Sequence, residues 1–371
     1  MKKKFLFSFL TFIFSFGIIY LLIFIYINLN LDKFLKYNII NKKNIINFYK
    51  EKSNTLHHLR DPKYVNTEKK NLEEYIFSYI EKNDSRETIL FQGDSWFDQI
   101  NLYANANQYF QTRFNNQFNV INAGTTSYSP SLMSVQYDLL KNNYNIKPSY
   151  LIAYIDQTDL GDENCRYKYL KKFNKKKLIA VPFEEYPYYS GMGIDLFIKH
   201  SEISLNNQGF SRTQAFINYK IKKTFYKIKK NYEKTINKKK FSGKCSFNEI
   251  NNYLIRNKKE EVEYFKNSLL EYLNKLDAEK NIKKIFIVTH PHRYHLNERK
   301  YNLNISSIVE DIIGKNSKFK HVNFTQKIRD NVKLYDNYDS IWLNDSAHLK
   351  ENFFIKIFLK EIIDEFYLFK N

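Results

Sequence analysis

Residues 89–100 read ILFQGDSWFDQI and join an apolar run to a polar turn. The run TILFQ at residues 88–92 predicts a buried strand, and residues 97–114 predict the helix that follows it. Gly93 lies at the turn between them, and Ser95 lies two residues further on. The chain has only 9 glycines in 371 residues, well below the usual share of about 7%. A glycine at this position therefore indicates a tight turn that needs it.

The same alternation of apolar strand and amphipathic helix continues to the C-terminus. Further strands are predicted at residues 118–122, 149–155, 283–290 and 319–324, and further helices at 131–142 and 349–369. Short apolar strands that alternate with helices are typical of a parallel sheet covered on both faces. We expect an α/β fold, namely a flavodoxin-like three-layer α/β/α sandwich with about five parallel strands.

The N-terminus predicts a membrane anchor. The three lysines of MKKK precede a long apolar run, and no charged residue lies between Lys4 and Asp32. Roughly 20 apolar residues span a bilayer core, and lysines before the run favour a cytoplasmic N-terminus. We expect a single-pass transmembrane helix within residues 1–31 and everything beyond it outside the cytoplasm, on the periplasmic side in a Gram-negative cell. A cleaved signal peptide of unusual length is the alternative.

Two further segments are distinguished by composition. Residues 32–83 are polar and rich in Lys and Asn, and they predict a membrane-proximal stem. His57 and His58 lie in this stem without an evident chemical partner, so we expect them at the surface. The main domain then covers residues 84–371, with a large Lys-rich insertion at about 160–258 that is too long for a simple loop.

The chain is strongly basic, with a net charge of +20 that comes mostly from lysine. An AT-rich genome explains the abundance of Lys, Asn, Ile, Phe and Tyr. Attraction to an anionic lipid or an anionic glycan is the alternative. Nucleic acid is not an expected partner, because arginine is scarce and no nucleic-acid-binding module is visible.

The two cysteines, Cys165 and Cys245, are 80 residues apart. An oxidising compartment allows a disulfide between them. Two free buried thiols are the alternative, because the sequence gives no distance between the two Cα atoms.

Two glycines follow successive predicted strands, and both strand ends carry candidate donors. Ser95 begins a helix just past the first strand, where its backbone N–H is free to donate and ligands bind in open parallel sheets. Gly124 follows the second strand, so its N–H is expected to point toward the same volume. Two such donors beside a serine form an oxyanion hole. The alternatives are a helix N-cap at Asp94 and an ordinary turn at Gly124.

The segment WLNDSAHLKENF at residues 342–353 provides a candidate base. Asp345 and His348 are three residues apart just before the predicted terminal helix. A nucleophilic serine needs a general base, and the base needs a carboxylate that orients it. This spacing allows one turn to present both groups to one site.

Together these blocks resemble the SGNH (GDSL-type) hydrolase family, over about residues 88–371. The resemblance implies that Ser95 attacks an ester carbonyl and that His348 accepts and returns the proton. It also implies that Asp345 orients His348 and that the N–H groups of Ser95 and Gly124 hold the oxyanion.

The third block departs from the family pattern, in which Gly-x-Asn-Asp follows the third strand. Here that strand runs into Asp156, Gln157, Thr158 and Asp159. Thr158 stands where the family has the Asn that donates to the oxyanion. A threonine hydroxyl can also donate, and Gln157 is a possible substitute. The change is compatible with a divergent branch, such as an acetyltransferase, or with a weakened enzyme.

The fourth predicted strand ends at His290, and His292 follows. A zinc site is one interpretation, but no Cys or carboxylate cluster accompanies these histidines. We expect them to line the cleft and to contact substrate oxygens, together with Asp94, Asp156 and Gln157. No metal and no cofactor are expected.

The resemblance and the predicted location imply a function. We expect a membrane-anchored serine ester hydrolase that acts on O-acyl groups, foremost O-acetyl groups, of an extracytoplasmic glycan or on another small ester. A glycan O-acetyltransferase with the same triad is one alternative. A non-catalytic factor that binds or assembles a surface polysaccharide is another. No oligomeric state is predicted.

Overall fold

The computed structural model describes most of the predicted main domain. The described residues are 11–12, 14–26, 42–60, 71–82, 85–115, 117–183, single positions between 211 and 228, 259–290, 305–325, 327–328, 330, 341–343 and 348–370. The chain divides into two compact units. One comprises Met1–Lys50, Asn66–Leu72 and Glu185–Phe241, and residues 14–26 within it are helical. The other comprises Glu51–Val65, Glu73–Glu184 and Ser242–Asn371 and contains the sheet.

The sheet has six strands in the order β1-β3-β2-β4-β7-β8. The strands are β1 (Ser78–Glu81), β2 (Thr88–Gln92), β3 (Asn119–Asn122), β4 (Tyr150–Asp156), β7 (Lys284–His290) and β8 (Phe319–Asn323). Neighbours from β3 to β8 are parallel, and β1 is antiparallel to β3. The strands β2, β3 and β4 are almost wholly buried, which fits their continuous apolar runs.

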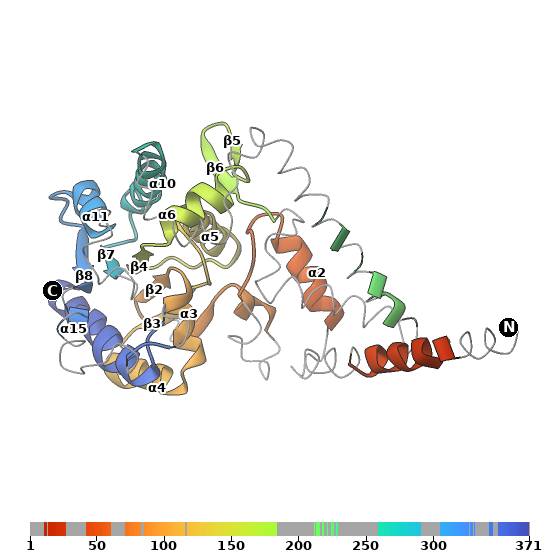
Figure 1. Cartoon of the computed structure of the whole chain (residues 1–371). Coiled ribbons are helices and arrows are strands. Elements are labelled where there is room, and N and C mark those ends of the chain that lie inside the picture. Colours follow the sequence, from red (N-terminus) through yellow and green to blue (C-terminus); the bar gives the residue numbers. More distant parts are fainter. Residues whose placement is uncertain are drawn as a thin grey trace, which may run out of the picture. The chain divides into compact units, whose positions relative to one another are not determined.

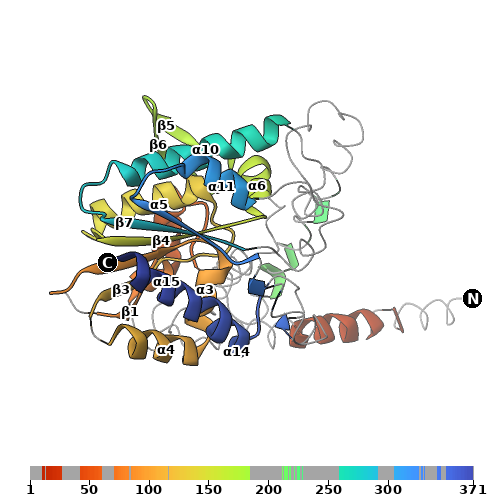
Figure 2. The same cartoon turned by 90° about the vertical axis from the view of Figure 1, so that its left-hand side faces the viewer.

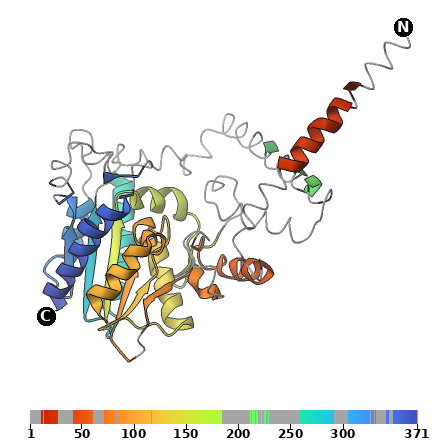
Figure 3. The same ribbon diagram turned by 90° about the horizontal axis from the view of Figure 1, so that it is seen from below.

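Helices cover both faces of this sheet (Figures 1 and 2). On one face lie α3 (Ser95–Leu102), α4 (Ala104–Phe114), the short helices α14 (Glu351–Phe353) and η7 (Phe354–Leu359), and α15 (Lys360–Lys370). Figure 3 shows α4 in orange and α15 in blue on the same side of the strands. On the other face lie α5 (Pro130–Asn143), α10 (Lys259–Asp277) and α11 (Ile305–Ile313). The arrangement is a mixed α/β fold compatible with a three-layer sandwich.

The predicted strands are confirmed with small changes at their ends, and two expectations need correction. The sheet has six strands rather than about five, because β1 pairs with β3 from a segment that we assigned to the stem. The predicted helix at 97–114 is two helices, α3 and α4. Tyr103 separates them with extended backbone (φ −99°, ψ 109°) and caps both.

The predicted anchor and disulfide are only partly within the described residues. None of the helices found there is long and apolar enough to span a membrane, and residues 1–31 fall partly outside the described set. Cys165 is buried in the π-helix η3 (Asp162–Tyr167) and is disulfide-bonded. Cys245 lies outside the described residues.

His57 and His58 correct a further expectation, because they are buried rather than at the surface, with exposures of 2% and 4%. His58 Nε2 lies 2.6 Å from the Thr126 carbonyl oxygen, which can only accept, so this nitrogen carries the proton. The Nδ1 atom of neutral His58 is then an acceptor, and His57 Nδ1 donates to it across 3.0 Å. The contacts therefore fix the tautomers of two neutral imidazoles.

This pair makes stability depend on pH. Burial lowers the pKa of His58 to about 4, against the opposing hydrogen bond to Thr126, and burial lowers the pKa of His57 well below its ordinary value. The unfolded chain therefore takes up protons near pH 6.5, where the folded chain does not. The stability is fully present above about pH 6.5 and is lost as the pH falls. For His58 the loss reaches about 3 kcal/mol by pH 4.

We expect the free energy of unfolding, measured in urea between pH 8 and pH 5, to fall with acid in the wild type. A His57→Gln/His58→Gln variant removes both titrating rings, and a glutamine at 58 keeps an amide donor for Thr126. Below pH 6.5 the wild type should lose free energy of unfolding through these two rings, whereas the variant should not. The difference in free energy of unfolding between the two proteins should therefore become steadily smaller. Parallel profiles would contradict the assignment of neutral buried histidines.

Candidate active site

Ser95 and His348 meet although 253 positions separate them in the sequence. His348 Nε2 lies 2.7 Å from Ser95 Oγ, and both side chains are half-buried, so solvent reaches them. A serine hydroxyl donates to Nε2 when the ring proton is on Nδ1. This is the contact that a nucleophile makes with its general base. Asp345, the predicted orienting carboxylate, lies outside the described residues.

Ser95 and His348 meet at the point in the sheet where the strand order reverses. β2 lies between β3 and β4, so the connections that follow β2 and β3 leave toward opposite faces. Ligands bind at this crevice in open α/β sheets, outside the carboxyl ends of the strands. Ser95 is the first residue of α3, and the Asp94 carboxylate caps the helix by accepting from Trp96 N at 2.9 Å. A Cβ on Gly93 would approach Tyr154 Cβ to 2.7 Å, so the turn requires a glycine.

The segment that carries His348 is held from both sides. Trp342 and Leu349 form an antiparallel bridge, and Leu343 N donates to the His348 carbonyl at 2.8 Å. Tyr103, at the end of the nucleophile helix, donates its hydroxyl to the Leu349 carbonyl at 2.9 Å. The His348 segment is therefore attached to the same helix that carries Ser95.

Gly124 does not offer the free N–H that we predicted for the oxyanion hole. Its N–H donates to Asn122 Oδ1 at 2.9 Å. A Cβ at this position would come within 2.4 Å of Phe97 Cβ and 2.8 Å of Asp98 N. The glycine therefore allows α3 to pack directly against the chain that follows β3.

Thr158 does not offer the free hydroxyl donor that we predicted either. Its N–H and its hydroxyl both donate to Asp156 Oδ1, at 2.6 and 2.7 Å. Of the three predicted oxyanion donors, only the Ser95 N–H has no acceptor within the part of the chain that the structure describes. Gln157, the possible substitute, is buried with 4% exposure.

A cluster of buried carboxyl groups lies beside the nucleophile. Carboxylate oxygens of Asp94, Asp156 and Asp159 lie within 4.8 Å of one another, and they are the only group of potential metal ligands among the described residues. Burial and the charge of Asp156 raise the pKa of Asp94 and of Asp159 well above the ordinary value. Asp94 and Asp156 share a side-chain hydrogen bond, which requires a proton on one of them. Asp159 Oδ1 is buried and has no hydrogen-bond partner among the described residues.

His290 does not line a cleft as predicted, because it is buried with 1% exposure at the end of β7. Its ring centroid lies 3.5 Å from that of Trp96, and its Nδ1 lies 3.2 Å from the Tyr154 hydroxyl. His290 therefore packs against Trp96, the residue that follows Ser95. His292 lies outside the described residues.

Several supporting residues were missed in the sequence. Asp98 is fully buried on the apolar side of α3, next to Phe97, and Arg60 is fully buried in the supposed stem. A charged residue on the apolar face of an amphipathic helix is a signal that it has a buried partner, but the sequence does not identify the partner.

We expect Tyr103→Phe to slow the reaction of Ser95 with a fluorophosphonate probe about fivefold, because one hydrogen bond of about 1 kcal/mol no longer holds the His348 segment. The melting temperature should change little. Tyr367→Phe is a matched control, since that hydroxyl donates to the Arg113 carbonyl at 3.0 Å and lies on α15 away from Ser95. Equal effects of the two variants would argue against the assigned role of Tyr103.

Comparison of the chain with models of known protein families gives no match, and comparison with curated proteins gives none either. The resemblance to the SGNH family stays a prediction that rests on the blocks around Gly93, Gly124 and His348.

Proposed function

We propose that the chain is a serine ester hydrolase in which Ser95 is the nucleophile and His348 is the general base. The observation that carries this proposal is the 2.7 Å contact between Ser95 Oγ and His348 Nε2 at the carboxyl edge of the sheet. The strand order without β1 supports it, because β3-β2-β4-β7-β8 is the 2-1-3-4-5 order of flavodoxin-like folds. That order brings the end of β2 into the crevice where such sheets bind ligands.

In the proposed reaction Ser95 Oγ bonds to the acyl carbon while its proton passes to His348 Nε2. The tetrahedral intermediate then loses the alcohol, and His348 returns the proton to the departing oxygen. Water repeats the sequence on the acyl-serine and releases a carboxylic acid. The Ser95 N–H is positioned at the start of α3, where the helix dipole favours the developing negative charge.

The substrate and the location belong to the proposal as well. We infer an O-acyl group, foremost O-acetyl, on an extracytoplasmic glycan, with the protein held at a membrane by residues 1–31. Both parts rest on the family resemblance and on the apolar N-terminus. Asp345 is assigned the orientation of His348 by its place in the last block.

One observation favours a second candidate, a non-catalytic factor that binds a surface polysaccharide. The Gly124 N–H and the Thr158 hydroxyl, two of the three oxyanion donors expected from the family pattern, are bound to Asn122 and Asp156. Removing one such donor in serine hydrolases costs about 3–4 kcal/mol of transition-state stabilisation. A site with a single free donor is therefore compatible with slow turnover or none.

We expect a fluorophosphonate probe to label the wild-type chain at Ser95 and to leave Ser95→Ala unlabelled. His348→Ala should react at least a hundredfold more slowly, because general base assistance contributes about 10²- to 10⁴-fold. Ser317→Ala, a change at an exposed serine, controls for adventitious labelling. The readout is the rate of labelling and the mass of the modified peptide.

Hydrolysis of an aryl acetate, with and without an added glycan, separates the remaining functions. Faster ester consumption with acylated glycan as product would indicate a transferase. If the wild-type chain folds but is neither labelled nor active, the proposed ester hydrolase is wrong. The non-catalytic polysaccharide-binding factor is then the remaining candidate.

A further inference from the structure

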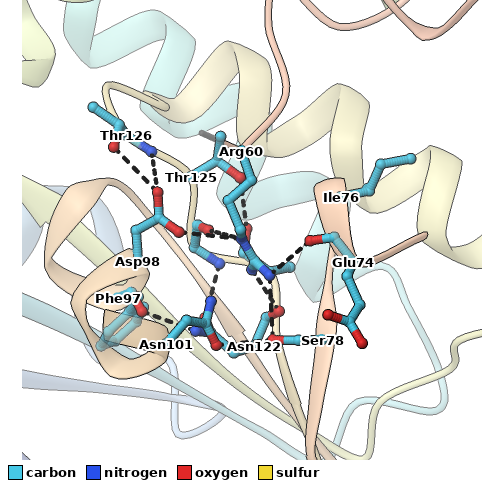
Figure 4. A network of polar contacts seen from close by, with 12 residues as sticks. Arg60, Glu74, Ile76, Ser78, Phe97, Asp98, Asn101, Asn122, Thr125 and Thr126 are labelled. Carbon is cyan, nitrogen blue, oxygen red and sulfur yellow. Dashed lines mark hydrogen bonds and ion pairs between the residues drawn. The ribbon is translucent and has the colours of Figure 1, made fainter. Parts of the chain in front are cut away.

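Arg60 is the centre of a buried polar network beside the nucleophile helix (Figure 4). Its side chain has no exposed surface. Its Nη2 donates to the Asn122 carbonyl at 2.8 Å and its Nε to the Gly124 carbonyl at 3.0 Å. Its Nη1 reaches the Glu74 carbonyl and the Ser78 hydroxyl, both at 3.2 Å. One guanidinium thus binds the chain that follows β3 to the segment around β1.

Asp98 connects this network to α3. Its Oδ1 lies 3.1 Å from Arg60 Nε, and the side chain is fully buried. Its Oδ2 accepts from the N–H and the hydroxyl of Thr126, at 3.2 and 3.1 Å. Asp98 is three residues after Ser95, so it lies about one helical turn from the nucleophile.

Two more contacts attach the same helix. Asn122 Nδ2 donates to the Phe97 carbonyl at 2.8 Å, and Ser78 Oγ, itself bound by Arg60, donates to Asn101 Oδ1 at 2.9 Å. Arg60 therefore binds the residues that make these two contacts, Asn122 and Ser78, as well as Asp98 itself.

The segment that carries Arg60 is fixed to the same chain. His58 binds the Thr126 carbonyl, and the Tyr128 hydroxyl donates to the His58 carbonyl at 2.6 Å. Residues 56–60 are all buried. The 122–128 segment is therefore held along its length by residues 56–60, which the sequence places in the stem.

We propose that Arg60 is a positioning residue of the active site, which acts through Asp98 and the carbonyls of Asn122 and Gly124 to fix α3 and Ser95 relative to His348. This inference rests on the proposed function, since it assigns a catalytic purpose to the position of α3. Arg60 does not touch the reacting atoms.

The alternative is a purely structural ion pair. Burial lowers the pKa of Arg60, and the charge of Asp98 opposes that effect, so the guanidinium stays charged. Removing one partner of a buried pair leaves an unpaired charge and destabilises the fold strongly, whereas replacing both by apolar residues is often neutral for stability. A double substitution therefore separates positioning from stability.

The experiment compares the full-length wild type with Arg60→Met/Asp98→Leu and with Arg60→Lys. Lysine keeps the charge but lacks the planar fork that binds three carbonyls and a carboxylate together. Arg113→Met/Asp364→Leu is the matched control, because it removes an exposed Arg–Asp pair on α4 and α15. Each protein is assayed for melting temperature, for kcat and KM with an aryl acetate, and for the rate of fluorophosphonate labelling.

We expect the Arg60→Met/Asp98→Leu variant to lose at least tenfold in kcat and in labelling rate, with KM within about threefold of the wild type. Arg60→Lys should be intermediate in kcat and in labelling rate, and the control pair should behave as the wild type. Wild-type kcat in a folded Arg60→Met/Asp98→Leu variant would overturn the inference. If that variant does not fold, wild-type kcat in Arg60→Lys would overturn it.

Amide hydrogen exchange gives a test that does not depend on activity. We expect faster exchange in peptides covering residues 93–103 and 119–128 of the variants, and unchanged exchange in β7. Equal acceleration throughout the sheet would show a structural role only and would overturn the inference. If the wild type is neither labelled nor active, the proposed function fails, and this exchange pattern alone decides whether Arg60 positions α3.

Discussion

The close contact between α3 and the chain that follows β3 determines where Ser95 lies. Gly124 has no side chain, so the backbone of Phe97 and Asp98 approaches it more closely than any Cβ would allow. Asn122 then bonds to the Phe97 carbonyl, and Thr126 bonds to Asp98. Ser95 is at the start of a helix whose first turn is fixed by side chains from the neighbouring strand end, the kind of support that the proposed catalytic role needs.

This tight packing has a chemical consequence. Two of the groups that the SGNH pattern assigns to the oxyanion, the Gly124 N–H and the Thr158 hydroxyl, donate to Asn122 and Asp156 instead. Each of them is satisfied inside the protein, as buried polar groups must be. The site therefore combines a well-formed contact between Ser95 and His348 with a Ser95 N–H that has no acceptor among the described residues.

The sequence predicts the parts of the fold that depend on apolar patterning. β2, β4 and β7 are mostly apolar and parallel, so their carboxyl ends lie at one edge of the sheet, and Ser95 follows one of these ends. β1 was missed because the short segment SYIE lies in a polar region. Arg60 was missed because its burial depends on partners that are distant in the sequence, and no periodicity records such partners.

The carboxyl groups beside Ser95 are compatible with a nearby negative charge only when some of them keep their protons. The transition state for ester cleavage is negatively charged, and an ionised carboxylate about 5 Å away would oppose it by on the order of 3 kcal/mol at an effective dielectric constant of about 20. The raised pKa of Asp94 and of Asp159 keeps protons on this cluster. The N–H and the hydroxyl of Thr158 both donate to Asp156 Oδ1, so this oxygen acts as an acceptor. In this block Thr158 stands where the SGNH pattern has the donor Asn, and burial limits the negative charge of the carboxyl groups around it.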